Sequence, residues 1–384
     1  MRRKTILIIS LGYSPNVGGL ETHLDNLASY LVKNNYNLFV ITYQPIQTKA
    51  KGKKLEKERN LEIRRIRWFG CGWLNILESY PPFALLYLFP GLFISSFLFL
   101  CKNHRSIDVV HAQGFICGVI ATILSEIFKK RTVLSTHSVY GFGKNSWTFR
   151  FLKRIINSFD MVLCLSEQSK QEIVEMGLDE KKVKVYTYWV NQALFTSMAK
   201  GDCKKRMGWE GKTVVLFVGR LVKSKGLHLL VDIAKRISLL ENQILFAILG
   251  DGLLAEEIEA VASREKNIVF LGKVNNSELG VFYNAADIFI VPSVSKMEGF
   301  PRVVIEALSC GIPVIASAIG CLPETIDSSV GLLCNPSVED FVEKIQYCCD
   351  KPEILERMSR NSREYAIKRY GEENARVIET SYYE

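Results

Sequence analysis

The sequence predicts an α/β protein of two doubly wound, Rossmann-like domains that face a cleft, and three observations support this fold class. The chain has 384 residues, more than one ordinary domain needs. Short apolar runs alternate with segments of helical period along almost its whole length. These runs are apolar throughout, which is typical of parallel strands covered on both faces. A hydrophobic content of 48% supports two cores and excludes a disordered chain.

Each half of the chain contains five runs that are expected to form strands. Those of the first half are residues 4–10, 37–42, 107–112, 131–136 and 160–166, with helices at 21–34 and 116–130. Those of the second half are 213–219, 243–250, 267–272, 287–293 and 312–317. The pattern is lost between residues 187 and 211, so the predicted domains are 1–188 and 189–368. Residues 369–384 are expected to form a helix that crosses back to the first domain.

The cysteines and the amino terminus indicate a reducing compartment. The chain has ten cysteines and no CxxC pair, and Cys348 and Cys349 are direct neighbours. This spacing does not resemble a metal site. The first residues run straight into a strand without a cleavable signal. We therefore expect reduced thiols and a cytoplasmic protein.

Much of the net charge of +9 is concentrated in residues 49–67. This segment has nine basic and three acidic residues, an excess of six, so the rest of the chain carries only +3. Such a run is either a solvated loop or a segment attracted to an anionic surface. A membrane is the favoured surface and nucleic acid is not expected, because no nucleic-acid-binding motif accompanies the run.

Residues 83–101 carry no charge and are long enough to span a membrane. However, the strands near residues 4 and 37 must pair with the strand near 107, so both flanks belong on one side of a bilayer. Pro90 and Gly91 also interrupt the segment. We expect a helix pair, partly buried and partly in the membrane interface, and a wholly buried helix is the alternative. A lipid or lipid-linked acceptor follows only from the interfacial interpretation, which predicts a peripheral protein on the inner membrane face.

The segment FVGRLVKSKG follows the first strand of the second half, at the edge where ligands bind in open α/β sheets. Gly219 allows the chain to turn, and Arg220 and Lys225 lie before a helix that begins near Leu227. Two cations at this edge can bind a phosphate, although both can also be ordinary surface residues.

The segment EGFPRVVIE favours a ligand at the same edge. Pro301 suits the first position of a helix that continues to Ser309, whose free N–H groups form an anion site. Gly299 permits close approach of a ligand. Glu306, at the rim, can accept hydrogen bonds from ribose hydroxyls, and Glu298 lies beyond the phosphates. This pattern indicates a nucleotide sugar, and two solvated glutamates in a turn are the alternative.

These segments resemble a known family of enzymes. Residues 298–326 resemble the E-x7-E donor-site signature of the retaining GT-B glycosyltransferases of family 4, also called group 1 glycosyl transferases. Residues 217–232 resemble that family's phosphate-binding loop. The resemblance implies the GT-B fold and transfer of a sugar from a nucleotide-diphosphate-sugar to a hydroxyl acceptor.

The resemblance also implies roles for individual residues of the second half. Arg220 and Lys225 would stabilise the leaving diphosphate, and Glu306 would bind the ribose. Glu298 would hold the sugar hydroxyls. Backbone groups that contribute to these contacts are those of Gly299, Phe300, Pro301, Val303 and Val304.

In the first half, the resemblance places Gly18 and Gly19 in a loop against the donor phosphates and the acceptor. A Gly-Gly pair alone is compatible with any turn, but this one lies at a strand-to-helix junction with Glu21 close behind. His137 follows a strand at the position of the family's active-site histidine, which contacts the donor sugar. His111 and Ser166 also match family positions, where packing and helix capping are the favoured roles.

The junction between the domains departs from the family pattern. The family has an Asn-Gly-Val-Asp-like segment there, whereas this chain has Tyr188 and Trp189 in place of Asn and Gly, and Asn191 in place of Asp. We therefore expect the contacts of the junction to differ, and with them the acceptor.

No side chain is an evident nucleophile, so the rate is expected to come from charge stabilisation of the departing diphosphate, with the acceptor attacking on the same face. The chain has no Asp-x-Asp pair to hold a divalent ion, so no metal and no other cofactor is expected. Two alternatives remain. One is a nucleotide-sugar epimerase, and the other is a non-catalytic GT-B partner subunit of a membrane glycosylation complex.

Overall fold

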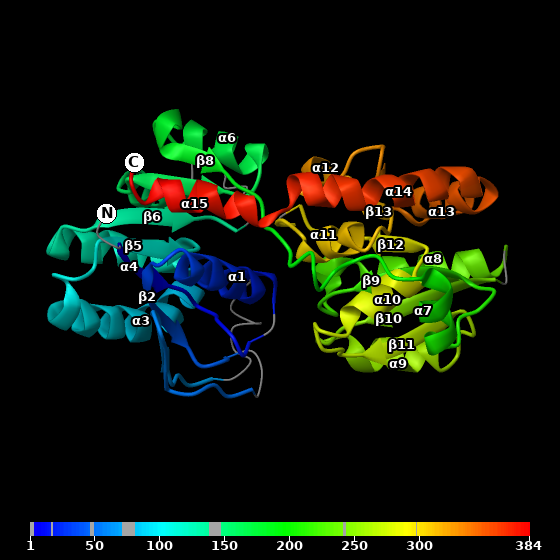
Figure 1. The fold of residues 1–384 in the computed structure, drawn as a ribbon, viewed down its shortest axis with the longest axis horizontal. Helices are drawn as coiled ribbons and strands as arrows, with labels where there is room; N and C mark the ends of the chain where they lie inside the picture. The colour runs from blue at the N-terminus through cyan, green and yellow to red at the C-terminus, as the bar shows by residue number, and fades with distance from the viewer. Residues whose placement is uncertain are drawn as a thin grey trace. The chain divides into compact units, whose positions relative to one another are not determined.

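The computed structural model describes residues 4–16, 18–46, 50–70, 81–137, 147–240, 243–296 and 298–384. The chain divides into two compact units, which are treated separately (Figure 1). Unit 1 comprises Met1–Tyr188 and Glu373–Glu384, and unit 2 comprises Trp189–Glu372. Each unit is a sheet of mainly parallel strands with helices on both faces, which confirms the predicted α/β class with two doubly wound domains.

Unit 1 contains an eight-stranded sheet in the order β3-β4-β2-β1-β5-β6-β7-β8. The strands are β1 (Thr5–Ile9), β2 (Asn37–Tyr43), β3 (Leu55–Glu58), β4 (Leu61–Ile66), β5 (Val109–Gln113), β6 (Arg131–Ser135), β7 (Met161–Cys164) and β8 (Val183–Val185). All neighbours are parallel except β3 and β4. The five strands predicted for this half are all present.

The basic run is not a solvated loop, and in this respect the first interpretation is wrong. Residue 49 lies outside the described residues, but β3 and β4 form an antiparallel hairpin at the edge of the sheet. Several of its cations are paired. Glu62 binds both Lys57 and Arg64, while the buried Arg65 binds Glu56 at 2.8 Å. The charges suit an edge strand because they discourage pairing with another chain.

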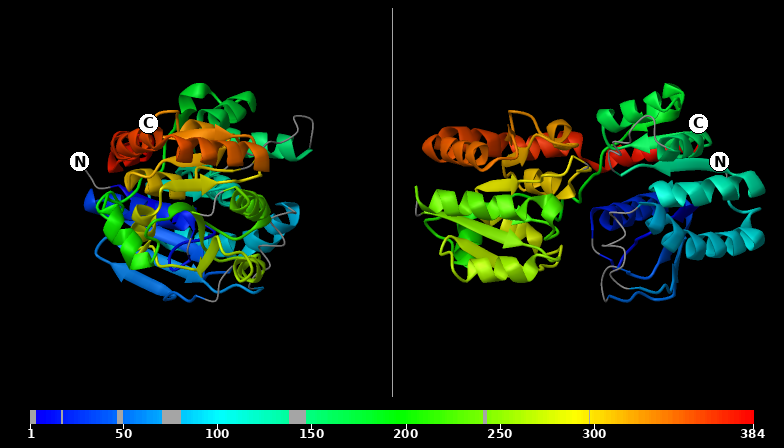
Figure 2. Two further views of the ribbon diagram at one scale, coloured as in Figure 1. Left: turned by 90° about the vertical axis from the view of Figure 1, so that its right-hand side faces the viewer. Right: turned by 180° about the vertical axis from the view of Figure 1, so that it is seen from behind.

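Helices cover both faces of this sheet, as the front and rear views show (Figures 1 and 2). Helices α1 and α15 lie on one face, and α3 and α4 lie on the other, where an apolar core of the unit forms. The helices are α1 (Gly19–Lys33), α3 (Pro81–Asn103), α4 (Phe115–Phe128), α5 (Trp147–Asn157), α6 (Glu167–Glu175) and α15 (Ala375–Ser381).

Helix α3 is one continuous helix, so the predicted helix pair at residues 83–101 is wrong. Pro90 lies inside it, and a proline is expected to break the backbone hydrogen bonds of a helix. Beside the proline, the hydroxyl of Tyr43 inserts into the helix. It donates to the carbonyl of Leu88 at 2.6 Å and accepts from the N–H of Leu92 at 3.1 Å. Gly91 makes this possible, because a Cβ there would lie 2.6 Å from the same hydroxyl.

The carboxyl-terminal helix α15 is bound to the sheet of unit 1 by buried polar contacts. Tyr382 is fully buried, and its hydroxyl lies 2.9 Å from Nδ1 of His111 on β5. Tyr30 and Tyr36 both donate hydrogen bonds to Glu379. These contacts explain why the last residues belong to unit 1, although helix α14 before them belongs to unit 2.

Unit 2 contains a six-stranded parallel sheet in the order β11-β10-β9-β12-β13-β14. Its strands are β9 (Thr213–Val218), β10 (Ile244–Leu249), β11 (Ile268–Gly272), β12 (Ile288–Val291), β13 (Val314–Ser317) and β14 (Gly331–Cys334). Its helices are α7 (Lys200–Met207), α8 (Leu227–Ser238), α9 (Ala255–Ala262), α10 (Leu279–Ala285), α11 (Arg302–Ser309), α12 (Leu322–Thr325), α13 (Val338–Asp350) and α14 (Pro352–Arg369). All five predicted strands are confirmed, and β14 is additional.

Candidate functional site

The predicted phosphate-binding loop of unit 2 lies at the carboxyl ends of β9 and β12. Arg220 follows β9 directly, and Lys225 ends a short 3-10 helix (Lys223–Lys225) before α8. Gly226 has φ of +70°, and a Cβ there would lie 1.8 Å from the carbonyl oxygen of Pro292 after β12. Only glycine fits this contact, so Gly226 brings the loop against the neighbouring strand end.

Lys225 and Glu298 form an ion pair in this structure. Nζ of Lys225 lies 2.5 Å from Oε1 of Glu298, whose side chain is buried. The backbone of Glu298 is held as well, because its carbonyl accepts from the N–H of Cys321 at 3.1 Å. The alternative of a solvated turn is therefore wrong for Glu298. The sequence predicted both residues but not their contact with each other.

The anion site predicted at the start of α11 is one residue later than expected. The helix begins at Arg302, and Pro301 is its N-cap with φ of −83° and ψ of 102°. No side chain caps this end, and the N–H of Val304 bonds to the carbonyl of Pro301 at 3.0 Å. The N–H groups of Arg302 and Val303 precede the first helical hydrogen bond, so an anion can accept from them.

Glu306 is buried in unit 2 and does not lie at an open rim as predicted. The hydroxyl of Tyr283 donates to its Oε2 at 3.0 Å, and Nη2 of Arg302 lies 3.6 Å from its Oε1. Burial raises the pKa of the Glu306 carboxyl, and the nearby Arg302 and the hydrogen bond from Tyr283 lower it. The carboxylate is therefore oriented by two partners before any ligand binds.

Arg302 is a site residue that the sequence analysis missed. It is buried, it pairs with Glu306, and its Nη1 donates to the carbonyl oxygen of Trp189 at 3.1 Å. The sequence signals were a cation in an otherwise apolar helix segment and its position four residues before Glu306. This hydrogen bond holds the backbone at Trp189 in place. The structure gives no reason for a tryptophan side chain at this position.

In unit 1, the glycines of the β1–α1 loop make room for a carboxylate. Gly18 is the N-cap of α1 in an extended conformation, and Gly19 is the first helical residue. A Cβ at Gly18 would lie 2.3 Å from Oε2 of Glu21, and one at Gly12 would lie 2.4 Å from Oε1. Glu21 is buried and accepts from Nδ2 of Asn16 at 2.6 Å. A side chain at Gly18 would thus displace the carboxylate of Glu21.

Asp25 lies one turn further along α1. The raised pKa of its carboxyl predicts that the stability of the protein depends on pH. Burial raises the pKa of the Asp25 carboxyl from 3.8 to about 6, against the lowering effect of a hydrogen bond from Tyr13. Between these values the unfolded carboxyl has lost its proton and the folded one keeps it. The free energy of unfolding therefore falls as the pH rises from 4 to 6.

We expect Asp25→Asn to remove this fall in the free energy of unfolding. The fall should be on the order of 1–2 kcal/mol, because Asp25 is partly exposed and solvent screens its charge. Urea unfolding of the wild type and the variant at pH 4, 5, 6 and 7 measures it. Glu58→Gln, an exposed acid on β3, is the control and should behave as the wild type. Parallel pH curves for all three proteins would contradict the prediction.

His137 lies just beyond β6, with both ring nitrogens in hydrogen bonds. Nδ1 lies 2.8 Å from the hydroxyl of Tyr188, and Nε2 lies 2.9 Å from Oε1 of Gln113. Burial lowers the pKa of the His137 imidazole to about 3, so the ring is neutral at physiological pH. Contact between a ring nitrogen and a donor sugar would require one of these bonds to break.

The two other family positions in unit 1 have structural contacts. His111 is fully buried between Ser135 and Tyr382, at 2.8 and 2.9 Å. Ser166 is the N-cap of α6 and accepts from the N–H of Ser169 at 3.1 Å. These are the packing and capping roles favoured from the sequence.

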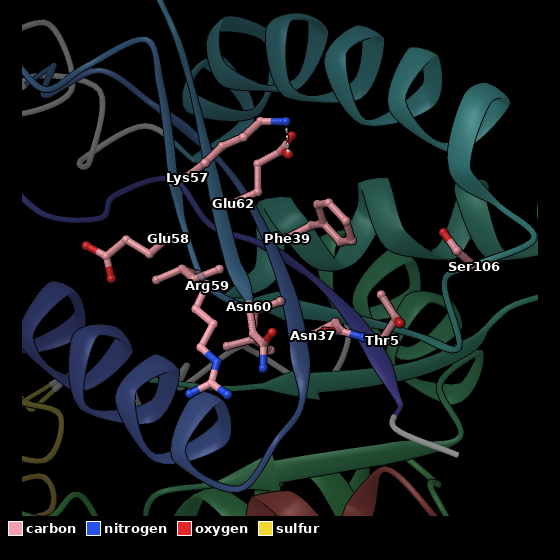
Figure 3. A pocket seen from close by; sticks show the side chains of 11 residues that line it. Thr5, Asn37, Phe39, Lys57, Glu58, Arg59, Asn60, Glu62 and Ser106 are labelled. Carbon is pink, nitrogen blue, oxygen red and sulfur yellow. Dashed lines mark ion pairs between the residues drawn. The ribbon is translucent and has the colours of Figure 1, made fainter.

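A separate hollow of about 360 Å³ lies at the opposite edge of the unit 1 sheet (Figure 3). Thr5 and Asn37, where β1 and β2 begin, line it, together with residues of the β3–β4 hairpin. Lys57 and Glu62 face each other there and form an ion pair at 2.9 Å. It contains none of the predicted site residues, and it is at the amino ends of the strands, where ligands of such sheets do not usually bind.

Within the described ranges, no group of three or more His, Cys, Asp or Glu side chains is arranged to hold a metal ion. The groups that are positioned for a ligand in unit 2 are cations, a helix start and two oriented carboxylates. Cations and N–H groups bind phosphates, and carboxylates bind hydroxyls.

Family models match both halves of the chain. Residues 17–191 match the model of the family described as Glycosyltransferase Family 4, and residues 202–365 match that of Glycosyl transferases group 1. The chain belongs to the family 4 glycosyltransferases. The predicted resemblance is thus confirmed for both halves of the chain.

Curated relatives of this glycosyltransferase include subunits of one named enzyme from two organisms. Phosphatidylinositol N-acetylglucosaminyltransferase of Arabidopsis thaliana has a subunit that is 26% identical over 351 residues, which cover 89% of this chain and 73% of the relative. The gpi3 subunit of the same enzyme in Schizosaccharomyces pombe is 24% identical over 353 residues, which cover 88% of this chain and 71% of the relative.

Solved structures share the fold over the whole chain. Sucrose-phosphate synthase from Thermosynechococcus elongatus has a TM-score of 0.79 at 21% identity and covers 99% of this chain and 98% of that one. HepE from Anabaena, solved in complex with UDP-glucose, has a TM-score of 0.76 at 20% identity and covers 98% of each chain. These similarities confirm the GT-B fold.

Proposed function

We propose that this chain transfers a sugar from a nucleotide-diphosphate-sugar to a hydroxyl acceptor, with retention of configuration at the anomeric carbon. The observation that carries the proposal is the set of groups at one sheet edge of unit 2. Arg220, Lys225 and the start of α11 are suited to a diphosphate, and Glu306 is oriented for a ribose. The solved neighbour with UDP-glucose makes a UDP-sugar the first donor to test.

In the proposed reaction, the bond between the anomeric carbon and the diphosphate oxygen breaks as the acceptor oxygen bonds to the same face of the sugar. The acceptor proton passes to the departing diphosphate. Arg220, Lys225 and the α11 N–H groups stabilise the charge that develops on this leaving group. An ammonium has three hydrogens, so Lys225 can keep its bond to Glu298 while it donates to a phosphate. No metal or cofactor takes part in this proposal.

The acceptor that we propose is a lipid or lipid-linked hydroxyl compound, reached by a peripheral protein on the cytoplasmic face of a membrane. Two observations support it. The names of the curated relatives specify phosphatidylinositol. In addition, helix α3 exposes an apolar stripe of Phe83, Leu86, Ile94 and Leu98, which are 61%, 71%, 56% and 56% exposed. The alternative of a wholly buried helix is therefore wrong.

Helix α3 is suited to lie on a membrane and not to cross it. In the part of the chain that the structure describes, it is the one helix long and apolar enough to span a bilayer, and 39% of its apolar window is buried. However, it packs on a sheet whose strands β4 and β5 flank it in the sequence. Lys102 lies in the last turn of α3 and Arg105 follows it, while Lys129 and Lys130 follow α4, near the contact of His104 with Phe128. An apolar stripe beside cations favours an anionic lipid surface.

Nucleotide release tests the proposed function. Purified protein is given UDP-N-acetylglucosamine, UDP-glucose or GDP-mannose, each with and without vesicles containing phosphatidylinositol. Release from one donor only with vesicles supports transfer to lipid, and lipid-independent release supports a soluble acceptor or hydrolysis. Donor binding without any release favours the non-catalytic partner subunit, and conversion of the free donor sugar to its epimer favours the epimerase.

Changes in the stripe should separate membrane binding from catalysis. We expect the triple variant Leu86→Gln, Ile94→Gln, Leu98→Gln to lower the fraction that sediments with anionic vesicles about tenfold or more, because about 1.5–3 kcal/mol of burial is lost at each fully inserted side chain. The control is Leu239→Gln with Leu253→Gln, since both leucines are 76% exposed in unit 2. Equal sedimentation of both variants with the vesicles would contradict the proposal that the apolar stripe of α3 contacts the membrane.

A further inference from the structure

A chain of hydrogen bonds lies at the carboxyl ends of β5 and β6 in unit 1. Tyr188 lies 2.8 Å from Nδ1 of His137, and Nε2 of His137 lies 2.9 Å from Oε1 of Gln113. Gln113 is the last residue of β5 and is buried. His23 of α1 stacks on the Tyr188 ring with a centroid distance of 4.4 Å, which holds that ring in place.

The chemistry of these groups gives the chain a direction. Oε1 of Gln113 can only accept, so Nε2 of His137 must carry the hydrogen. Nδ1 of the neutral ring is then an acceptor, and the hydroxyl of Tyr188 must donate to it. Burial, which lowers the pKa of His137 to about 3, keeps the ring in this neutral form. Every donor therefore points from Tyr188 toward Gln113.

The chain ends in a donor without a partner. Among the described residues, Nε2 of Gln113 is a buried atom that has no hydrogen-bond partner. A buried polar group left unpaired destabilises the fold, and most such groups in folded proteins are paired. Its position at the carboxyl edge of the sheet is where ligands of doubly wound domains bind. The missing partner is thus accounted for by a ligand.

We propose that Tyr188, His137 and Gln113 form a directed hydrogen-bond chain that presents the Gln113 amide N–H to a hydroxyl or phosphate oxygen of the substrate bound at unit 1. This inference rests on the proposed transferase function. Gln113 is then a substrate-binding residue, and Tyr188 and His137 are positioning residues. The chain also gives a reason for the departure from the family pattern at Tyr188, because the asparagine of that pattern is too short to replace a tyrosine hydroxyl.

The direction of the chain can be tested without any activity assay. The full-length protein is labelled with ¹⁵N-histidine, of which the chain has five residues, and His137→Gln identifies the His137 signals. Long-range ¹H–¹⁵N spectra should show His137 as the neutral Nε2–H tautomer from pH 5 to 8. Tyr188→Phe should leave this tautomer in place, because Gln113 still accepts from Nε2–H, and should shift the Nδ1 signal, which loses its donor. An Nδ1–H form or a titration near pH 6.5 in the wild type would overturn the proposal.

The substrate contact is tested by Gln113→Glu, which keeps an acceptor for His137 and removes the N–H donor. We expect a tenfold or larger rise in KM for the substrate that it contacts, donor sugar or vesicle-borne phosphatidylinositol, with a smaller change in kcat. Gln168→Glu on the exposed part of α6 is the control and should leave both constants unchanged. Unchanged KM values in an active Gln113→Glu enzyme would overturn this inference alone, whereas an inactive wild type would overturn the proposed function with it.

Discussion

Lys225→Ala is expected to lower sugar transfer about 100- to 1000-fold while the protein stays folded. The variant lacks the ammonium that stabilises the leaving diphosphate, a contribution of the size measured for single groups of this kind in other enzymes. It also leaves the buried carboxylate of Glu298 without the cation that lies 2.5 Å away. A loss of stability of about 1–3 kcal/mol should therefore accompany the loss of activity. Nucleotide release and urea unfolding measure the two effects.

The chain offers a matched control for this variant. Lys223 lies in the same 3-10 helix and is exposed, so Lys223→Ala removes the same charge from the loop without touching Glu298. Its transfer rate should stay within about threefold of the wild type, since an exposed charge is screened by solvent. Equal losses in both variants would show that loop charge alone matters, and full activity of Lys225→Ala would exclude its assigned role.

Arg302→Leu is expected to weaken both the fold of unit 2 and the binding of UDP. Its guanidinium pairs with the buried Glu306 and donates to the carbonyl of Trp189, so two buried acceptors lose a partner. Removing one side of a buried ion pair costs about 3–5 kcal/mol. Arg302 also opposes the rise that burial causes in the pKa of Glu306. Without it the carboxyl takes up a proton more readily and becomes a poorer acceptor for ribose hydroxyls.

A double variant separates stability from ligand binding. Arg302→Leu with Glu306→Gln removes both charges and should recover part of the lost stability, because no unpaired charge stays buried. UDP affinity, measured by titration calorimetry, should not recover, since the ribose acceptor is absent. Arg357→Leu on an exposed part of α14 is the control. If the double variant were less stable than Arg302→Leu, the unpaired charge of Glu306 would not be the cause of the stability lost in Arg302→Leu.

Most of the strand framework could be predicted because its signal is local. All ten expected strands are continuous apolar runs, and all ten are present in the two sheets. Among the described strands, β3, β4, β8 and β14 were missed, and the first two carry another signal. Strands β3 and β4 are rich in charge, as LEKE and LEIRRI, because they form an edge hairpin. A charged edge strand and a charged loop have the same composition, and only pairing with β2 distinguishes them.

Helix α3 shows why a local rule can fail. Proline in the middle of an apolar run predicts an interruption, and the predicted helix pair followed from that rule. The helix nevertheless continues, and Tyr43, almost fifty residues earlier in the sequence, inserts its hydroxyl between Leu88 and Leu92. No property of residues 83–101 contains this information.

In the candidate site as well, the sequence indicated the residues but not most of their contacts. Residue types and spacing were enough to select Arg220, Lys225, Glu298 and Glu306, because phosphates require cations and hydroxyls require acceptors. Most of their partners were not predictable. The pairing of Lys225 with Glu298 and of Glu306 with Tyr283 joins side chains far apart in the sequence. The pairing of Arg302 with Glu306 is different, because it joins residues four apart on α11, a spacing that the sequence does show.

The sequence by itself determined the two doubly wound domains, the sheet edge that carries the site, and the glycosyltransferase family. Each depends on hydrophobic period or on short motifs whose chemistry is local. The tertiary structure decided how deeply Glu306 is buried, which partners hold the ring of His137, and which face of α3 stays exposed. Burial and hydrogen-bond partners arise only when distant segments pack together, so a linear pattern can name the reacting groups but not the environment that sets their charge.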